Sequence, residues 1–244
     1  MRQREDLLDA LVGGETRIGV GFSEGMGARH EKTVVDNNGK LNGKSLFVLD
    51  SNADFYLVST SDQKIFLVNA KAEGLERRAL ATIDRTRTTC ELAYNNVSAD
   101  LISDNPSIFN EGLDNALVAI AADTLGAAQC ALDQAVLYAG QREQFNRVIA
   151  SFQAVKHMCA EMAAKIEASR VMVWHAACSI DVSLDNHAVG AGLCKSHLSE
   201  VGKFVSKTAT EVHGGMGFIE ETGAAQHLRD SRIAPIYEGT NGIQ

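Results

Sequence analysis

Proline, tryptophan and paired cysteines are scarce in this sequence of 244 residues. It has two prolines and one tryptophan, and its five cysteines include no Cys-x-x-Cys pair. So few prolines exclude a proline-rich linker. An odd number of scattered cysteines predicts free thiols and not a disulfide framework, as is typical of a reducing compartment, and we expect a cytoplasmic protein.

The sequence also lacks an excess of positive charge and a long uninterrupted apolar run. Asp and Glu number 31 against 23 Lys and Arg, a net charge of −8, which repels nucleic acid and anionic membrane surfaces. The longest apolar region, residues 117–132, contains Asp123, Thr124 and Gln129, so it predicts a buried helix and not a membrane span. The seven histidines match no standard zinc spacing, and we expect no metal site.

The texture of the sequence changes near residue 105. Before it, short runs rich in β-branched and aromatic residues alternate with turn signals, which predicts strands. These strands are expected at residues 16–23, 32–36, 45–49, 55–60, 64–69 and 88–94, with a hairpin turn at 37–40 and a short opening helix at 4–12. Together these strands predict a small antiparallel β domain at residues 15–104.

After residue 105 the apolar residues recur three and four apart, which predicts helices. We expect them at residues 113–139, from an N-cap at Ser151 to about residue 180, at 186–212, and at 223–229. Many alanines let such helices approach closely. The fold class is therefore α+β, with the β domain followed by an antiparallel helix bundle at residues 105–244.

Three groups of residues in the helical part suggest ligand contacts. Arg142 and Phe145 offer a planar set of donors and an aromatic face, although a cation at a helix C-terminus is the simpler interpretation. The glycine-rich stretch 213–218 follows a helix, so it is either a helix cap or a close approach to a phosphate, and it is not a Rossmann motif. Near the end, Glu238 stands between Tyr237 and a glycine, typical of a surface turn or of a reachable carboxylate base.

The order and spacing of these motifs resemble the acyl-CoA dehydrogenase family of flavoproteins. The resemblance is strongest over residues 108–244 and looser over the β region, where Phe22-Ser23-Glu24 and Leu41-Asn42-Gly43-Lys44 match. It rests on the following segments in order: Arg142-x-x-Phe145, Ser151-Phe152-Gln153, Gly214-Gly215-Met216-Gly217-Phe218, Arg229-Asp230 and Ile236-Tyr237-Glu238-Gly239-Thr240. The family has an N-terminal helical domain, of which residues 1–14 would be a remnant.

The resemblance implies FAD-dependent α,β-dehydrogenation of an acyl-CoA thioester in fatty acid metabolism. Glu238 would remove the α-proton while the β-hydride passes to flavin N5, and Tyr237 and Gly239 would line the thioester site. Thr240, Ser23 and Phe47 are assigned to the flavin. The diphosphate and adenosine half of FAD, from a neighbouring subunit, is assigned to Arg142, Phe145, Gln153, Gly214 and Gly215.

The implied partners are an acyl-CoA, an electron-transfer flavoprotein and further subunits, in a homodimer, a homotetramer or a heteromer. Departures from the family pattern leave an alternative open. Leu49 replaces a flavin-side threonine, Glu211 replaces a glutamine near the diphosphate, and Leu117 replaces an arginine. These changes suit a non-catalytic or half-catalytic partner subunit of a heteromeric enzyme.

Two relatives of the family fit less well. A nitroalkane oxidase typically has aspartate at the base position, where this chain has Glu238. A DNA-associated relative needs a basic face, whereas the net charge is −8.

Overall fold

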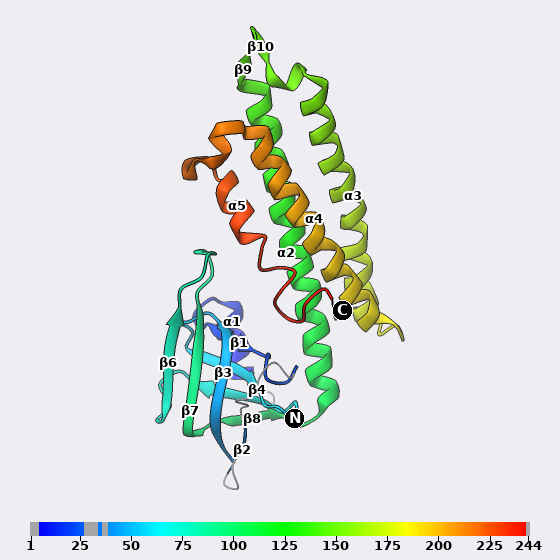
Figure 1. Ribbon diagram of the computed structural model, residues 1–244. Coiled ribbons are helices and arrows are strands. Elements are labelled where there is room, and N and C mark those ends of the chain that lie inside the picture. Colours follow the sequence, from blue (N-terminus) through cyan, green and yellow to red (C-terminus); the bar gives the residue numbers. More distant parts are fainter. Residues whose placement is uncertain (1–4, 27–33, 36–38, 243–244) are drawn as a thin grey trace. The chain divides into compact units, whose positions relative to one another are not determined.

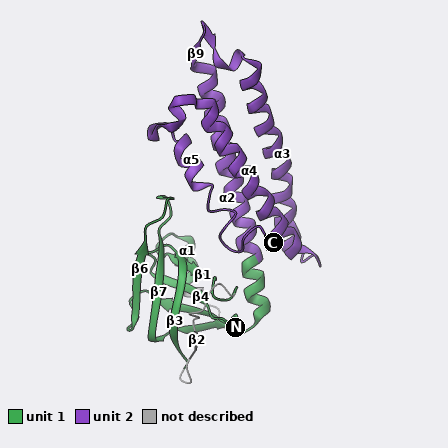
Figure 2. Cartoon of the chain, viewed as in Figure 1, with its two compact units in different colours: residues 1–113 green, residues 114–244 purple. Residues whose placement is uncertain are grey.

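The computed structural model describes residues 5–26, 34–35 and 39–242, and the chain divides into two compact units (Figures 1 and 2). The first unit is residues 1–113 and the second is residues 114–244. The first contains a short helix, α1 (Glu5–Val12), and two four-stranded sheets. The second unit is built mainly of helices.

The sheets of the first unit share an apolar core. One sheet has the order β1-β4-β5-β8 and the other β2-β3-β7-β6. The large side chains of Leu41, Tyr56 and Val58 are fully buried between them. The strands are β1 (Ile18–Gly21), β2 (Val34–Val35), β3 (Lys40–Leu49), β4 (Phe55–Ser59), β5 (Ile65–Asn69), β6 (Leu75–Leu80), β7 (Thr89–Ser98) and β8 (Asp100–Ser103).

Most of these strands lie where the sequence predicts them, with some differences. β1 pairs with β4 in parallel, while the other pairings in the two sheets are antiparallel. β6 and β8 were not expected; β6 is an edge strand whose residues 76–79 are all exposed, so it shows no alternating apolar pattern. The expected hairpin turn at 37–40 falls mainly outside the described residues, although Gly39 has a φ of +76°.

A bulge in β3 pushes an aromatic ring outwards. The register between β3 and β7 shifts between Ser45 and Val48, and Phe47, inside this bulge, has a φ of +56° and is 54% exposed. The preceding Leu46 is held on both sides. Ser23 Oγ donates to the Leu46 carbonyl oxygen at 2.8 Å, and the Leu46 N–H donates to Glu24 Oε1 at 2.9 Å.

The helical unit is built on three long helices and one short one. They are α2 (Pro106–Gln141), α3 (Gln153–Asp181), α4 (His187–His213) and α5 (Ala224–Asp230). A small hairpin of β9 (Glu143–Gln144) and β10 (Arg147–Val148) follows α2, and single 3-10 turns occur at η1 (Ile149–Ser151), η2 (Gly214–Phe218) and η3 (Glu220–Thr222). This α+β architecture confirms the predicted fold class.

Helix ends show what the sequence revealed and what it did not. α2 starts earlier than expected because Asn105 Oδ1 accepts the Ser107 N–H at 3.0 Å, with Pro106 as the first helical residue. The predicted cap at Ser151 is wrong: its hydroxyl donates back to the Val148 carbonyl at 2.7 Å and closes η1. α3 begins two residues later, after Phe152.

Small residues bring the long helices close together. A Cβ on Gly202 of α4 would lie 2.6 Å from Thr124 Cγ2 of α2, so any larger residue would push these helices apart. By length and composition alone, α2 could cross a membrane, but one such helix is weak evidence for a membrane span. In the structure, 44% of its most apolar stretch is buried. Its inward residues, including Leu117 and Ala121, belong to the bundle core.

Candidate active site

The segment after α5, drawn in red in Figure 1, folds into a closed loop that contains Glu238. The Asn241 N–H donates to the Pro235 carbonyl at 3.2 Å, which joins the two ends of the loop. Glu238 has a φ of +52° and Gly239 a φ of +93°. Positive φ is natural for glycine, but it costs a glutamate roughly 1–3 kcal/mol. The backbone at the predicted base is therefore strained.

This strain has a measurable effect on stability. We expect Glu238→Gly to be more stable than Glu238→Ala by about 1 kcal/mol, because both remove the carboxylate but only glycine relieves the positive φ. Urea unfolding of the two variants measures the difference. Equal midpoints and slopes would show that the turn carries no strain.

Side chains of α4 hold this loop in place. The Lys195 ammonium donates to the Gly239 carbonyl at 2.5 Å, and one turn further Ser199 Oγ accepts from Asn241 Nδ2 at 2.7 Å. Ser206 and Ser231 hydroxyls lie 2.9 Å apart. The three α4 residues 195, 199 and 206 recur at helical spacing and are all buried. Sequence reasoning missed Lys195, because a lysine in a helix usually lies on the solvent face.

The predicted diphosphate residues gather at the other end of α4. Phe145, at the tip of the β9–β10 hairpin, is 86% exposed, and its ring meets the ring of Phe152 edge to face at 6.1 Å. The Arg142 carbonyl accepts the Ile149 N–H at 2.8 Å, while its side chain is exposed. Gln153 is exposed at the first position of α3. These three side chains therefore leave their polar and aromatic groups open to a ligand.

The glycine-rich turn lies at the same end. His213, the last residue of α4, stacks on Tyr138 of α2 at 4.7 Å, which brings the turn to the end of α2 that carries Arg142. Gly214 caps α4 with a φ of +59°. A Cβ on Gly215 would meet nothing within 4 Å, whereas one on Gly217 would lie 2.3 Å from the Thr210 carbonyl. Gly217 is thus needed by the fold, and Gly215 is not.

Within one chain these two groups are far apart. Lys195, which holds the Glu238 loop, and His213, beside the glycine turn, are 18 residues apart on α4. At 1.5 Å per residue they are about 27 Å apart. The remaining predicted cofactor residues, Ser23 and Phe47, lie in the first unit, and Thr240 is exposed beside Gly239.

The structure shows the surroundings of the three residues that depart from the family pattern. Glu211 is exposed on α4, and its carboxylate lies 3.6 Å from the Lys207 ammonium, which offsets its charge. Leu117 is buried in the bundle core. Leu49 is half-buried at the end of β3.

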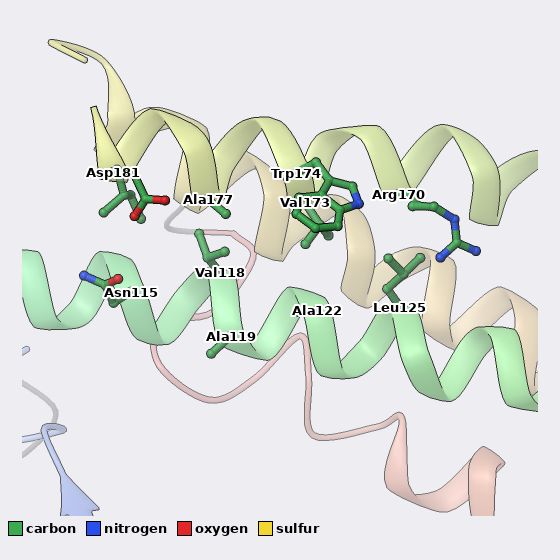
Figure 3. A pocket seen from close by; sticks show the side chains of 11 residues that line it. Asn115, Val118, Ala119, Ala122, Leu125, Arg170, Val173, Trp174, Ala177 and Asp181 are labelled. Atoms are coloured by element: carbon green, nitrogen blue, oxygen red, sulfur yellow. The ribbon is translucent and has the colours of Figure 1, made fainter. Parts of the chain in front are cut away.

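A cavity of about 490 Å³ lies elsewhere, between α2 and α3 (Figure 3). Its walls are mostly apolar, with Arg170 and Asp181 among its polar residues. The predicted site residues are absent from its lining. In the described part of the chain, no three His, Cys, Asp or Glu side chains are grouped so as to hold a metal ion.

Comparison with known proteins identifies the class. The sequence model of a protein family described as "Acyl-CoA dehydrogenase, C-terminal domain" matches residues 107–244, more than half of the chain. A short-chain specific acyl-CoA dehydrogenase of Megasphaera elsdenii is 31% identical over 267 aligned positions, covering 99% of this chain and 69% of that protein. The chain belongs to the acyl-CoA dehydrogenase family.

Further relatives refine the likeness. Subunit CarC of the caffeyl-CoA reductase-Etf complex of Acetobacterium woodii is 38% identical over 142 residues, 55% of this chain and 37% of that protein. The solved butyryl-CoA dehydrogenase of Megasphaera elsdenii matches with a TM-score of 0.84 and 28% identity, over 98% of this chain and 68% of that one. The chain thus spans between 37% and 69% of the length of these curated relatives.

The likeness extends to a structure that holds the cofactor. An acyl-CoA dehydrogenase of Bacillus anthracis, solved in complex with FAD, matches with a TM-score of 0.78 and 24% identity, over 88% of this chain and 43% of that one. At that identity the match shows the shared fold alone.

Proposed function

We propose that this chain catalyses α,β-dehydrogenation of an acyl-CoA thioester with FAD bound, and that Glu238 is the base. The observation that carries the proposal is the strained, closed loop that presents the Glu238 carboxylate next to a glycine. Strained backbone at a polar residue is typical of active sites. Family membership supplies the reaction class.

Each residue of the loop has its own role in the proposed reaction. The Glu238 carboxylate removes the α-proton of the thioester, and Gly239, lacking a side chain, lets the acyl group approach the backbone. Tyr237 is half-buried beside them and lines the thioester site. FAD, when bound, accepts the β-hydride. Lys195 and Asn241 keep the loop closed during the reaction.

The groups at the far end of α4 fit the diphosphate and adenosine half of FAD. The exposed Arg142 guanidinium suits a phosphate, the exposed Phe145 ring suits a base, and the open surface at Gly215 admits a ligand against the backbone. Gln153 and Gly214 complete this end, and we assign Ser23, Phe47 and Thr240 to the flavin half. Because Lys195 and His213 are about 27 Å apart along α4, we infer that the two groups of residues serve different FAD molecules in a homodimer or homotetramer.

Electrons then leave to an electron-transfer flavoprotein. The CarC relative is a subunit of an Etf complex, which supports this partner. We further propose a cytoplasmic location.

Reconstitution with FAD tests the function. The purified chain is titrated with FAD, and the bound flavin is then mixed with acyl-CoAs of different lengths under anaerobic conditions. We expect loss of the flavin absorbance band with at least one acyl-CoA. A flavin band that is unchanged by every acyl-CoA would contradict the proposed reaction.

A second candidate is the non-catalytic partner subunit of a heteromer. The observation in its favour is Glu211, whose carboxylate lies on α4 one turn before Gly214 and Gly215 and, despite Lys207, adds negative charge where a diphosphate would bind. Failure to bind FAD alone, together with binding when a related subunit is added, would favour this candidate.

The open surface at Gly215 gives a sharp test of the cofactor end. We expect Gly215→Ala to weaken FAD binding by about tenfold, since one methyl group would fill the space that the ligand needs, while the melting temperature stays unchanged. Flavin fluorescence titration measures the affinity. Gly217→Ala is the contrasting control, because its methyl group collides with the Thr210 carbonyl and destabilises the fold itself.

A further inference from the structure

A lysine is completely buried in the helix that supports the loop. Lys195 is 0% exposed, beside apolar residues of the bundle core such as Cys194 and Leu198. Burying an ammonium group costs free energy unless it is paired and hydrogen-bonded. Packing alone would be served better by leucine or methionine at this position, so the ammonium requires another explanation.

The ammonium group makes its contact at the strained turn. Its Nζ donates to the carbonyl of Gly239, the residue directly after Glu238, at 2.5 Å. Burial lowers the pKa of Lys195 to about 8. The Glu238 carboxylate acts in the opposite direction, since its negative charge raises the pKa of the ammonium group. Lys195 therefore binds the backbone of the neighbouring residue Gly239 and interacts with Glu238 itself through charge.

We propose that Lys195 is the positioning residue for the Glu238 base, holding the Gly239 carbonyl so that the strained turn keeps the carboxylate in one orientation. The inference rests on the proposed function of Glu238. A glutamate at positive φ relaxes readily to other conformations unless its surroundings hold it. A charge-assisted hydrogen bond from a buried lysine of α4 supplies that restraint.

Lysine suits this task better than the other polar residues of the same helix face. Its four-carbon stem packs in the core, and its compact ammonium reaches beyond the helix to the loop. Ser199, one turn further, is shorter and binds the loop only through the Asn241 side chain. Asn241 lies two residues beyond Gly239, so Ser199 fixes the end of the loop and Lys195 fixes its centre.

The test compares Lys195→Met with Lys207→Met. Methionine keeps the apolar stem and removes the donor, and Lys207 is an exposed lysine of the same helix, so its variant is the matched control. Hydrogen exchange of residues 236–242 is measured by mass spectrometry. We expect exchange about tenfold faster in Lys195→Met and unchanged in Lys207→Met. Exchange in Lys195→Met at the wild-type rate would overturn the proposal.

Kinetics of the FAD-loaded protein give a second readout. We expect Lys195→Met to lower kcat by about tenfold to a hundredfold, with KM and flavin content changed less than about twofold, because the base is present but misplaced. A rise in KM with kcat unchanged would overturn the positioning role. If the wild-type protein oxidises no acyl-CoA, the proposed function fails, while the exchange experiment still decides whether Lys195 holds the loop.

A third measurement needs no variant at position 195. In wild-type protein with ¹⁵N-labelled lysine, the ammonium protons of Lys195 should exchange with solvent at least about tenfold more slowly than those of Lys207. This experiment replaces the first if Lys195→Met does not fold. Equal exchange rates for the two ammonium groups would overturn the proposal.

Discussion

Replacing Glu238 by glutamine is expected to lower kcat for acyl-CoA oxidation by about 10²- to 10⁴-fold, the usual contribution of a general base. Glutamine has the same shape as glutamate but cannot accept a proton. The backbone turn is unchanged, so flavin content should match the wild type, whereas stability should fall slightly because the Lys195 ammonium loses the nearby negative charge. Rapid mixing with acyl-CoA under anaerobic conditions measures the rate at which the flavin is reduced.

The matched control is Glu221→Gln, the same change at an exposed position in η3. It should leave the rate unchanged. A Glu238→Gln protein as fast as the wild type would remove Glu238 as the base.

Stability should depend on pH through Lys195. Burial lowers the pKa of Lys195 from the ordinary value of 10.5 to about 8 in the folded protein. Between those two pH values the unfolded chain binds one more proton than the folded chain at this residue, so folding stability rises with pH. Relative to Lys195→Met, the wild-type free energy of unfolding should increase by about 3 kcal/mol from pH 8 to pH 10.5.

Urea unfolding of both proteins at several pH values measures this difference. Tyrosines, cysteines and the other lysines titrate in the same pH range. Both proteins contain these residues, so their contributions to the difference in unfolding free energy largely cancel. Below about pH 7 the difference should be constant, because Lys195 is then protonated in the folded and unfolded states. A difference that stays constant up to pH 10.5 would show that the buried ammonium is fully stabilised.

The sequence predicted the helical unit better than the strands. Long runs with apolar residues three and four apart located α2, α3 and α4, since a helix that is buried on one side must have this period. The predicted cap at Ser151 was wrong because a hydroxyl before a helix can equally close a 3-10 turn, as it does here with Val148. β6 was missed because a charged edge strand has no buried face to mark it.

For the candidate site the sequence indicated residues, which stay predictions, and it gave no indication of their geometry. Ordered motifs indicated Glu238 and Gly215, yet the positive φ at Glu238 arises from loop closure between Pro235 and Asn241, which no local pattern reveals. Lys195 was missed for a similar reason. A lysine in a helix usually marks the solvent face, and only tertiary packing shows that this one points inward.

The distance between the two ends of α4 has an evolutionary consequence in the proposed assembly. Each chain contributes its base to one FAD site and its diphosphate-binding end to another, so natural selection can act on the two ends separately. After gene duplication, one copy can lose its base and still be retained, because its other end completes the site of its neighbour. A family built this way can give rise to pairs of unequal subunits by simple decay of one half of one gene.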